Sequence, residues 1–115
     1  MRPEDRRRHP RYEARGLRAR LLQIHRCEVL KLSRTGMLLS APVELQPDAI
    51  VPAEVYLTGT VFRSQARVAF VGPDTGPAGS GRTRIGLEFV DPAPSAQRIL
   101  DQFIAERFAH QTPSA

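Results

Sequence analysis

The twelve residues TVFRSQARVAFV, from Thr60 to Val71, are the longest stretch of the chain that alternates in the manner of a β-strand. Successive side chains of a strand point to opposite faces, so the stretch has two faces of different polarity. The more apolar face holds, in order, Phe62, Ser64, Ala66, Val68 and Phe70. This face is expected to point inward, so the stretch predicts one long strand packed against a hydrophobic core.

Five shorter stretches with strand character accompany it, at residues 16–24, 26–32, 37–40, 53–57 and 83–90. Neighbouring strands that are joined by short turns pair in the antiparallel sense. Closing such a sheet into a barrel removes its exposed edges. We therefore predict an all-β fold, a six-stranded antiparallel β-barrel, with an open, rolled sheet as the alternative.

One helix is predicted at the C-terminal end of the chain, after Ser95 as its N-cap. Apolar residues then recur at steps of mostly three and four, at Ala96, Ile99, Leu100, Phe103, Ile104 and Phe108. This spacing forms one apolar stripe on a helix of about four turns. We expect the stripe to pack against the barrel and cover an open end; a partner-binding stripe is the alternative.

The composition is that of a single globular domain with a mostly aliphatic core. The chain has 115 residues, 6% aromatic residues and no Trp. No apolar run approaches the roughly 20 residues that span a bilayer, and no apolar segment follows the N-terminal charges as in a secretory signal. Cys27 is the only cysteine, which excludes an internal disulfide and favours a reducing compartment. We therefore expect a cytoplasmic protein with no membrane partner.

The positive charge is concentrated at the N-terminal end. Residues 1–20 contain eight Arg and three acidic residues, a net charge of +5 that equals the charge of the whole chain. Arg favours planar, bidentate partners such as phosphates and guanine edges. Codon usage at high GC content is the alternative cause of the abundance of Arg.

We predict a flexible Arg-rich arm at 1–14, a barrel with its helix at 15–110, and a tail at 111–115.

Two motifs in this order carry a family resemblance. Residues 7–11 read RRHPR, with Arg7 and Arg11 four positions apart, and residues 31–36 read KLSRTG. Together they resemble the PilZ domain, whose signature is R-x-x-x-R followed by D/N-x-S-x-x-G. Residues 85–90, IGLEFV, are similar to the last strand of that family. The resemblance covers nearly the whole chain.

The resemblance implies a six-stranded antiparallel barrel that binds cyclic di-GMP, with the arm folding over the ligand. Carried over by position, Arg7 and Arg11 would contact guanine and phosphate, and Arg6 would add a further contact. Ser33 would supply a hydroxyl group, and Gly36 would allow the turn. Two phosphates suit several cationic donors, and the O6 and N7 acceptors of guanine match the fork of an arginine.

Lys31 departs from the family pattern, because it stands where the signature has Asp or Asn. A carboxylate or amide oxygen can accept hydrogen bonds from guanine, whereas an ammonium group has no acceptor. We expect Lys31 to contact a phosphate of the ligand or to face away from it. The affinity and the stoichiometry of binding depend on which of these holds.

Other chemistry is not indicated by the sequence. His9, His25 and His110 are scattered without the spacing of a metal site, and no phosphate-cradling loop or catalytic signature is present. We expect no catalytic residue, no bound metal and no enzymatic activity.

Three functions are compatible with these observations. The favoured one is a cyclic di-GMP receptor that changes the conformation of its arm and signals to an unidentified protein effector. The second is a PilZ-like interaction module that has lost the ligand. The third is nonspecific binding of nucleic acid by the arm, which we favour least.

Overall fold

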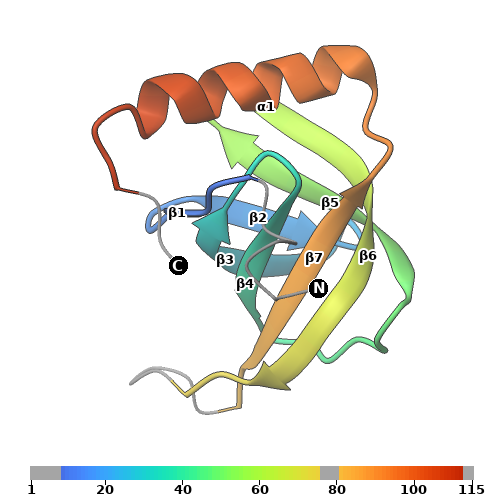
Figure 1. Cartoon of the computed structure of the whole chain (residues 1–115). Coiled ribbons are helices and arrows are strands. Elements are labelled where there is room, and N and C mark those ends of the chain that lie inside the picture. Colours follow the sequence, from blue (N-terminus) through green and yellow to red (C-terminus); the bar gives the residue numbers. More distant parts are fainter. Residues whose placement is uncertain (1–8, 76–80, 113–115) are drawn as a thin grey trace, which may run out of the picture.

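The computed structural model describes residues 9–75 and 81–112, which form a β-barrel with one helix lying across it (Figure 1). In chain order, the strands are β1 Tyr12–Glu13, β2 Arg18–Leu21, β3 His25–Leu32, β4 Gly36–Ala41, β5 Ile50–Leu57, β6 Thr60–Pro73 and β7 Thr83–Val90. The helix, α1, runs from Pro94 to Arg107. It is too short to cross a bilayer, and the described residues contain no other helix.

Six of the strands form a closed barrel. They follow the order β3-β2-β5-β6-β7-β4, and a further pairing between β4 and β3 completes the ring. All neighbours are antiparallel, with β6 and β7 pairing over most of their length. The predicted six-stranded antiparallel barrel is therefore confirmed, and the open sheet is excluded. The short strand β1 pairs with Lys31 and Leu32 of β3 on the same side as β2, beyond Glu28, which pairs with the first residue of β2.

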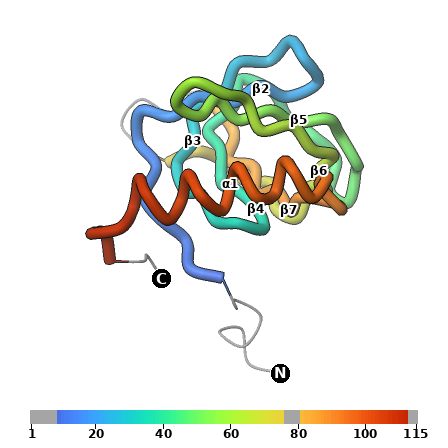
Figure 2. The backbone as a smooth tube through the Cα atoms, turned by 90° about the horizontal axis from the view of Figure 1, so that it is seen from above, coloured from blue at the N-terminus to red at the C-terminus, as the bar shows by residue number. Residues whose placement is uncertain are grey.

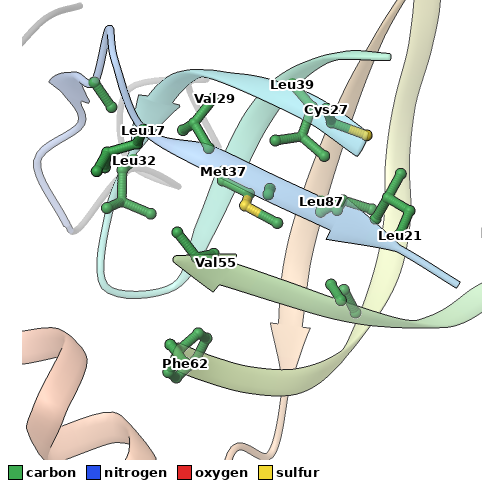
Figure 3. Packing of buried hydrophobic residues seen from close by; sticks show 14 of the residues in the cluster. Leu17, Leu21, Cys27, Val29, Leu32, Met37, Leu39, Val55, Phe62 and Leu87 are labelled. Atoms are coloured by element: carbon green, nitrogen blue, oxygen red, sulfur yellow. The ribbon is translucent and has the colours of Figure 1, made fainter. Parts of the chain in front are cut away.

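The core is aliphatic, as the composition predicts. Leucine, valine and methionine side chains from all sides of the barrel meet inside it (Figure 3). Phe62 is the largest fully buried side chain, and its ring meets that of Phe89 edge to face at 4.8 Å. Burying a side chain of this size contributes about 1.5–3 kcal/mol. These contacts fix the strands that carry the surface features described below.

The helix covers one end of the barrel, as seen from above in Figure 2. Leu100 and Phe108 are buried, and Ala96, Phe103 and Ile104 pack against the core, whereas Ile99 stays 39% exposed. Ser95 is not the N-cap, because the helix already begins at Pro94 with Ala93 in the capping position. Proline suits the first helical position, since it needs no N–H partner there and its φ is already helical.

A β-bulge overturns one prediction on the longest strand. Phe62, Ala66 and Val68 are buried as expected, but Phe70 is 52% exposed. Val68 lies opposite Leu87 and Phe70 lies opposite the next residue of β7, Gly86, so Ala69 has no partner of its own. An extra residue in one strand reverses the alternation that follows it. The prediction that Phe70 faces the core is therefore wrong, and its ring lies on the outer surface.

Candidate functional site

A hollow of about 530 Å³ lies on the outer surface of the barrel, between the residues that precede β1 and the strands β3, β4, β7 and β6. Four residues singled out from the sequence line it: Arg11, Lys31, Ser33 and Gly36. Arg6 and Arg7 lie outside the described residues. The hollow therefore brings together one arginine of the first motif and the key positions of the second.

Strand register explains how these residues meet. Tyr12 pairs with Leu32, so Arg11, just before β1, comes beside Ser33, just after β3. Across the sheet, Lys31 lies opposite Leu38, which in turn lies opposite Gly86. Adjacent strands are about 4.8 Å apart, so these pairings place Arg11 within a few strand widths of the second motif.

The turn between β3 and β4 is built by Ser33. Its backbone N–H donates to the Gly36 carbonyl at 2.9 Å, and its Oγ accepts from the Thr35 N–H at 3.2 Å. The Ser33 Oγ also lies 3.3 Å from the Thr35 hydroxyl oxygen. Serine side chains commonly stabilise turns by bonding to the backbone two residues on. With only 5% of the residue exposed, Ser33 shapes the rim of the hollow through the turn itself.

Gly36 is required by close packing and not by its backbone angles. Its φ does not lie in the left-handed region, unlike that of Gly16, Gly59 and Gly81. A Cβ at position 36 would instead collide with the carbonyl oxygen of Leu87 on β7. The absence of a side chain lets the turn approach β7, where the Phe89 N–H donates to the Thr35 carbonyl at 2.9 Å.

Arg34, in the middle of the same turn, connects it to the helix. Its Nε and a terminal nitrogen donate to the two carboxylate oxygens of Asp101 at 3.1 and 2.9 Å. Gln97 Nε2 donates to the Arg34 carbonyl at 3.0 Å and to Asp101 Oδ1 at 2.7 Å. An exposed ion pair adds little stability, but a bidentate one fixes orientation. The turn that borders the hollow is thus attached to α1.

The segment that follows Arg11 is also attached to the end of α1. The Tyr12 ring stacks on Phe108 with centroids 5.1 Å apart, and the Glu13 N–H donates to Gln111 Oε1 at 2.6 Å. The structure thus places Tyr12 and Glu13, which we assigned to the arm, on the barrel. It also places Gln111, which we assigned to the tail, against β1.

Lys31 lies on the wall of the hollow and is partly exposed. Its Nζ is 4.0 Å from Glu13 Oε2, with 28% of the lysine side chain exposed.

Sequence reasoning missed the opposite wall, where Phe70 and Glu88 line the hollow. The bulge that turns Phe70 outward depends on the partner strand, so no local signal reveals it. Glu88 could have been found, because it lies on the outward face of the predicted strand 83–90.

The described residues show little sign of catalytic chemistry. They contain no cluster of three or more metal-ligating side chains. Cys27 is buried, and burial raises the pKa of its thiol to about 11. A thiol with such a pKa stays protonated at neutral pH and is a poor nucleophile.

The fold and the hollow define a small β-barrel domain with a ligand-sized site on its outer surface. The sequence profile of the PilZ domain matches residues 5–106, so the chain belongs to the PilZ domain family. This confirms the resemblance seen in the two motifs. No curated protein matches the chain.

Solved structures share the fold at low identity. YcgR from Escherichia coli in complex with c-di-GMP has a TM-score of 0.70 at 24% identity, over 90% of this chain and 47% of that one. The Bacillus subtilis inhibitor of motility, MotI/DgrA, has a TM-score of 0.76 at 20% identity, over 93% and 53%. The PilZ domain of YcgR with c-di-GMP has a TM-score of 0.69 at 19% identity, over 90% and 95%. The chain spans about half the length of the first two proteins.

Proposed function

We propose that this chain is a receptor for cyclic di-GMP, which binds in the hollow between Arg11 and the turn from Ser33 to Gly36. The observation that carries the proposal is the strand register, which brings Arg11 of the first motif to the same surface as the second motif. Membership of the PilZ family supports it, as do the structures of YcgR and of its PilZ domain with c-di-GMP.

The cationic side of the hollow suits the ligand. A bis-phosphate attracts several charged donors, and charge-assisted bonds from arginine are among the stronger contacts that proteins make. Arg11 and Lys31 line the hollow, and the sequence places Arg6 and Arg7 a few residues before Arg11. We assign all four to the ligand, with Lys31 directed to a phosphate because it has no acceptor for guanine.

Signalling would pass from the hollow to α1. Both segments that border the hollow are attached to this helix, the turn through Arg34 and Asp101, and β1 through Tyr12 and Phe108. A ligand that changes the conformation of the N-terminal arm and shifts the turn would therefore alter the surface presented by α1. Such conformational changes are a common way to convert ligand binding into recognition by a protein partner.

Calorimetric titration with cyclic di-GMP tests the proposal. The unaltered chain should bind at micromolar concentration or tighter, and Arg7→Ala and Arg11→Ala should each weaken binding by at least about tenfold, as expected for loss of a charge-assisted hydrogen bond. Arg15→Ala is the matched control, because Arg15 is exposed and does not line the hollow. Binding that survives both arm variants, or no binding at all, would refute the proposal.

The same titration separates the two alternative functions. Binding only to long DNA, with an affinity that falls steeply as salt rises, would identify the arm as a nonspecific nucleic-acid binder. No binding to either ligand would favour an interaction module without a ligand.

A further inference from the structure

The side of the hollow formed by β6 and β7 differs in chemistry from the side formed by the arm. The arm side is cationic, whereas the other carries an exposed aromatic ring, Phe70, and a carboxylate, Glu88. Neither residue belongs to the two motifs. Both positions follow from the pairing of β6 with β7, so they are fixed by the barrel itself.

Glu88 is held in place from one side only. It lies opposite Gly36 on β4 and opposite Arg67 on β6. Nε and a terminal nitrogen of Arg67 both donate to Oε1 of Glu88, at 3.1 and 2.5 Å. Within the described residues, Oε2 of Glu88 has no hydrogen-bond partner, and 59% of the side chain is exposed. The carboxylate is therefore oriented by Arg67 and can accept further hydrogen bonds at the edge of the hollow.

Phe70 provides an apolar wall in the next outward-facing pair of residues along β6 and β7. The bulge turns it outward opposite Gly86, which has no side chain to cover the ring. Its ring extends along β6 over Gly72, where a Cβ would lie 2.8 Å from the ring tip. An aromatic ring that lies along the surface beside a hollow offers one face to a flat ligand group.

We propose that Phe70 and Glu88 form a guanine subsite of the hollow. In this subsite, Glu88 supplies the hydrogen-bond acceptor that the family signature has at the position of Lys31. The proposal rests on the proposed function and goes further, because it assigns the recognition of the base to β6 and β7. The N1–H and N2–H groups of guanine donate to the Glu88 carboxylate. The face of the base packs on Phe70, while the phosphates lie toward Arg11 and Lys31.

The subsite predicts a preference for guanine over adenine. A carboxylate has only acceptors, and the Watson–Crick edge of guanine presents two donors side by side. Adenine presents an unprotonated N1 on that edge, whose lone pair would face the carboxylate without a proton between them. Stacking on Phe70 does not discriminate, because every base has a π-face. Glu88 should therefore determine selectivity, and Phe70 should contribute affinity to either base.

The test compares the affinities of cyclic di-GMP and cyclic di-AMP for the full chain and its variants. Glu88→Gln should weaken the binding of cyclic di-GMP at least about tenfold. It should also reduce the preference for cyclic di-GMP over cyclic di-AMP, because an amide can donate to adenine N1 as well as accept. Phe70→Ala should weaken the binding of both ligands by a similar factor, about five- to a hundredfold, as expected for the loss of one base-stacking contact.

Matched controls separate these effects from general damage to the barrel. Glu54→Gln breaks a similar ion pair, to Arg63 at 2.8 Å, and Ile50→Ala removes another exposed apolar side chain; neither residue lines the hollow. Equal thermal unfolding of the variants and their controls excludes a folding defect.

The outcomes distinguish the two proposals. If the unaltered chain binds cyclic di-GMP and the Glu88 and Phe70 variants match their controls, the subsite is refuted while the receptor function stands. If the unaltered chain binds neither dinucleotide, the receptor function fails, and the subsite fails with it.

Discussion

Replacing Gly36 by Ala would test how closely β4 must approach β7 beside the hollow. The new Cβ would collide with the carbonyl oxygen of Leu87 and lie 3.3 Å from its carbonyl carbon. Both obstacles are backbone atoms of a strand that pairs with β4 from Gly36 to Ala41. They can move away only if the pairing between these strands is distorted.

The cost follows from three contributions. Overpacking a close contact costs about 1–3 kcal/mol, and a weakened hydrogen bond between the strands adds about 1 kcal/mol. Alanine restricts the unfolded chain more than glycine does, which offsets about 0.4–1 kcal/mol. We therefore expect Gly36→Ala to lower the free energy of unfolding by about 2 kcal/mol, which corresponds to roughly 8 °C in Tm for a domain of this size.

Urea unfolding followed by circular dichroism measures this loss. Gly86→Ala is the matched control, because a Cβ there would lie 3.2 Å from the Phe70 Cβ, a close contact that a shift of a few tenths of an ångström relieves. The control should lose less than about 1 kcal/mol, as is usual where the surroundings can adjust. A Gly36→Ala variant within about 0.5 kcal/mol of the unaltered chain, the usual range of neutral surface changes, would refute the argument from close packing.

Three further predictions concern the core, the helix contact and pH. Phe62→Ala should destabilise the chain by about 3–5 kcal/mol in urea unfolding, because it empties a fully buried site against Phe89; a loss below about 1.5 kcal/mol would mean that the barrel collapses around the gap. Arg34→Ala should cost no more than about 1 kcal/mol, since the pair with Asp101 is exposed, yet it should speed hydrogen exchange in the turn; unchanged exchange would argue against attachment of the turn to α1. Burial raises the pKa of Cys27 from 9.0 to about 11, so the folded chain holds this proton more tightly than the unfolded chain does. The stability from this effect is complete below pH 9.0 and is lost as pH rises to about 11; Cys27→Ala should remove this component, and an identical decline in the variant would contradict it.

Much of the fold could be predicted from local patterns. The strand from Thr83 to Val90 matches its prediction at both ends, because its alternation is clear and a proline follows soon after. The strand before the Thr58-Gly59 turn begins at Ile50, three residues earlier than predicted, despite the break expected at Pro52. Pro52 lies just past the end of β2, where its carbonyl accepts from the Leu22 N–H at 3.0 Å. A proline is tolerated where its missing N–H has no strand partner to serve.

The candidate site could be predicted only in part. Motif positions identified Arg11, Lys31, Ser33 and Gly36, and the register of the barrel brings all four to one hollow. The β6–β7 wall could not be predicted from periodicity, because the bulge after Val68 depends on which residues of β7 lie opposite. A pattern read along one strand does not contain that information.

The most direct test of a ligand site in this hollow is backbone hydrogen exchange with and without saturating cyclic di-GMP. We predict slower exchange at residues 11–13, 31–38 and 86–88 and no change along β5. Binding of the dinucleotide that leaves those segments unprotected, or that protects β5 in their place, would contradict this prediction.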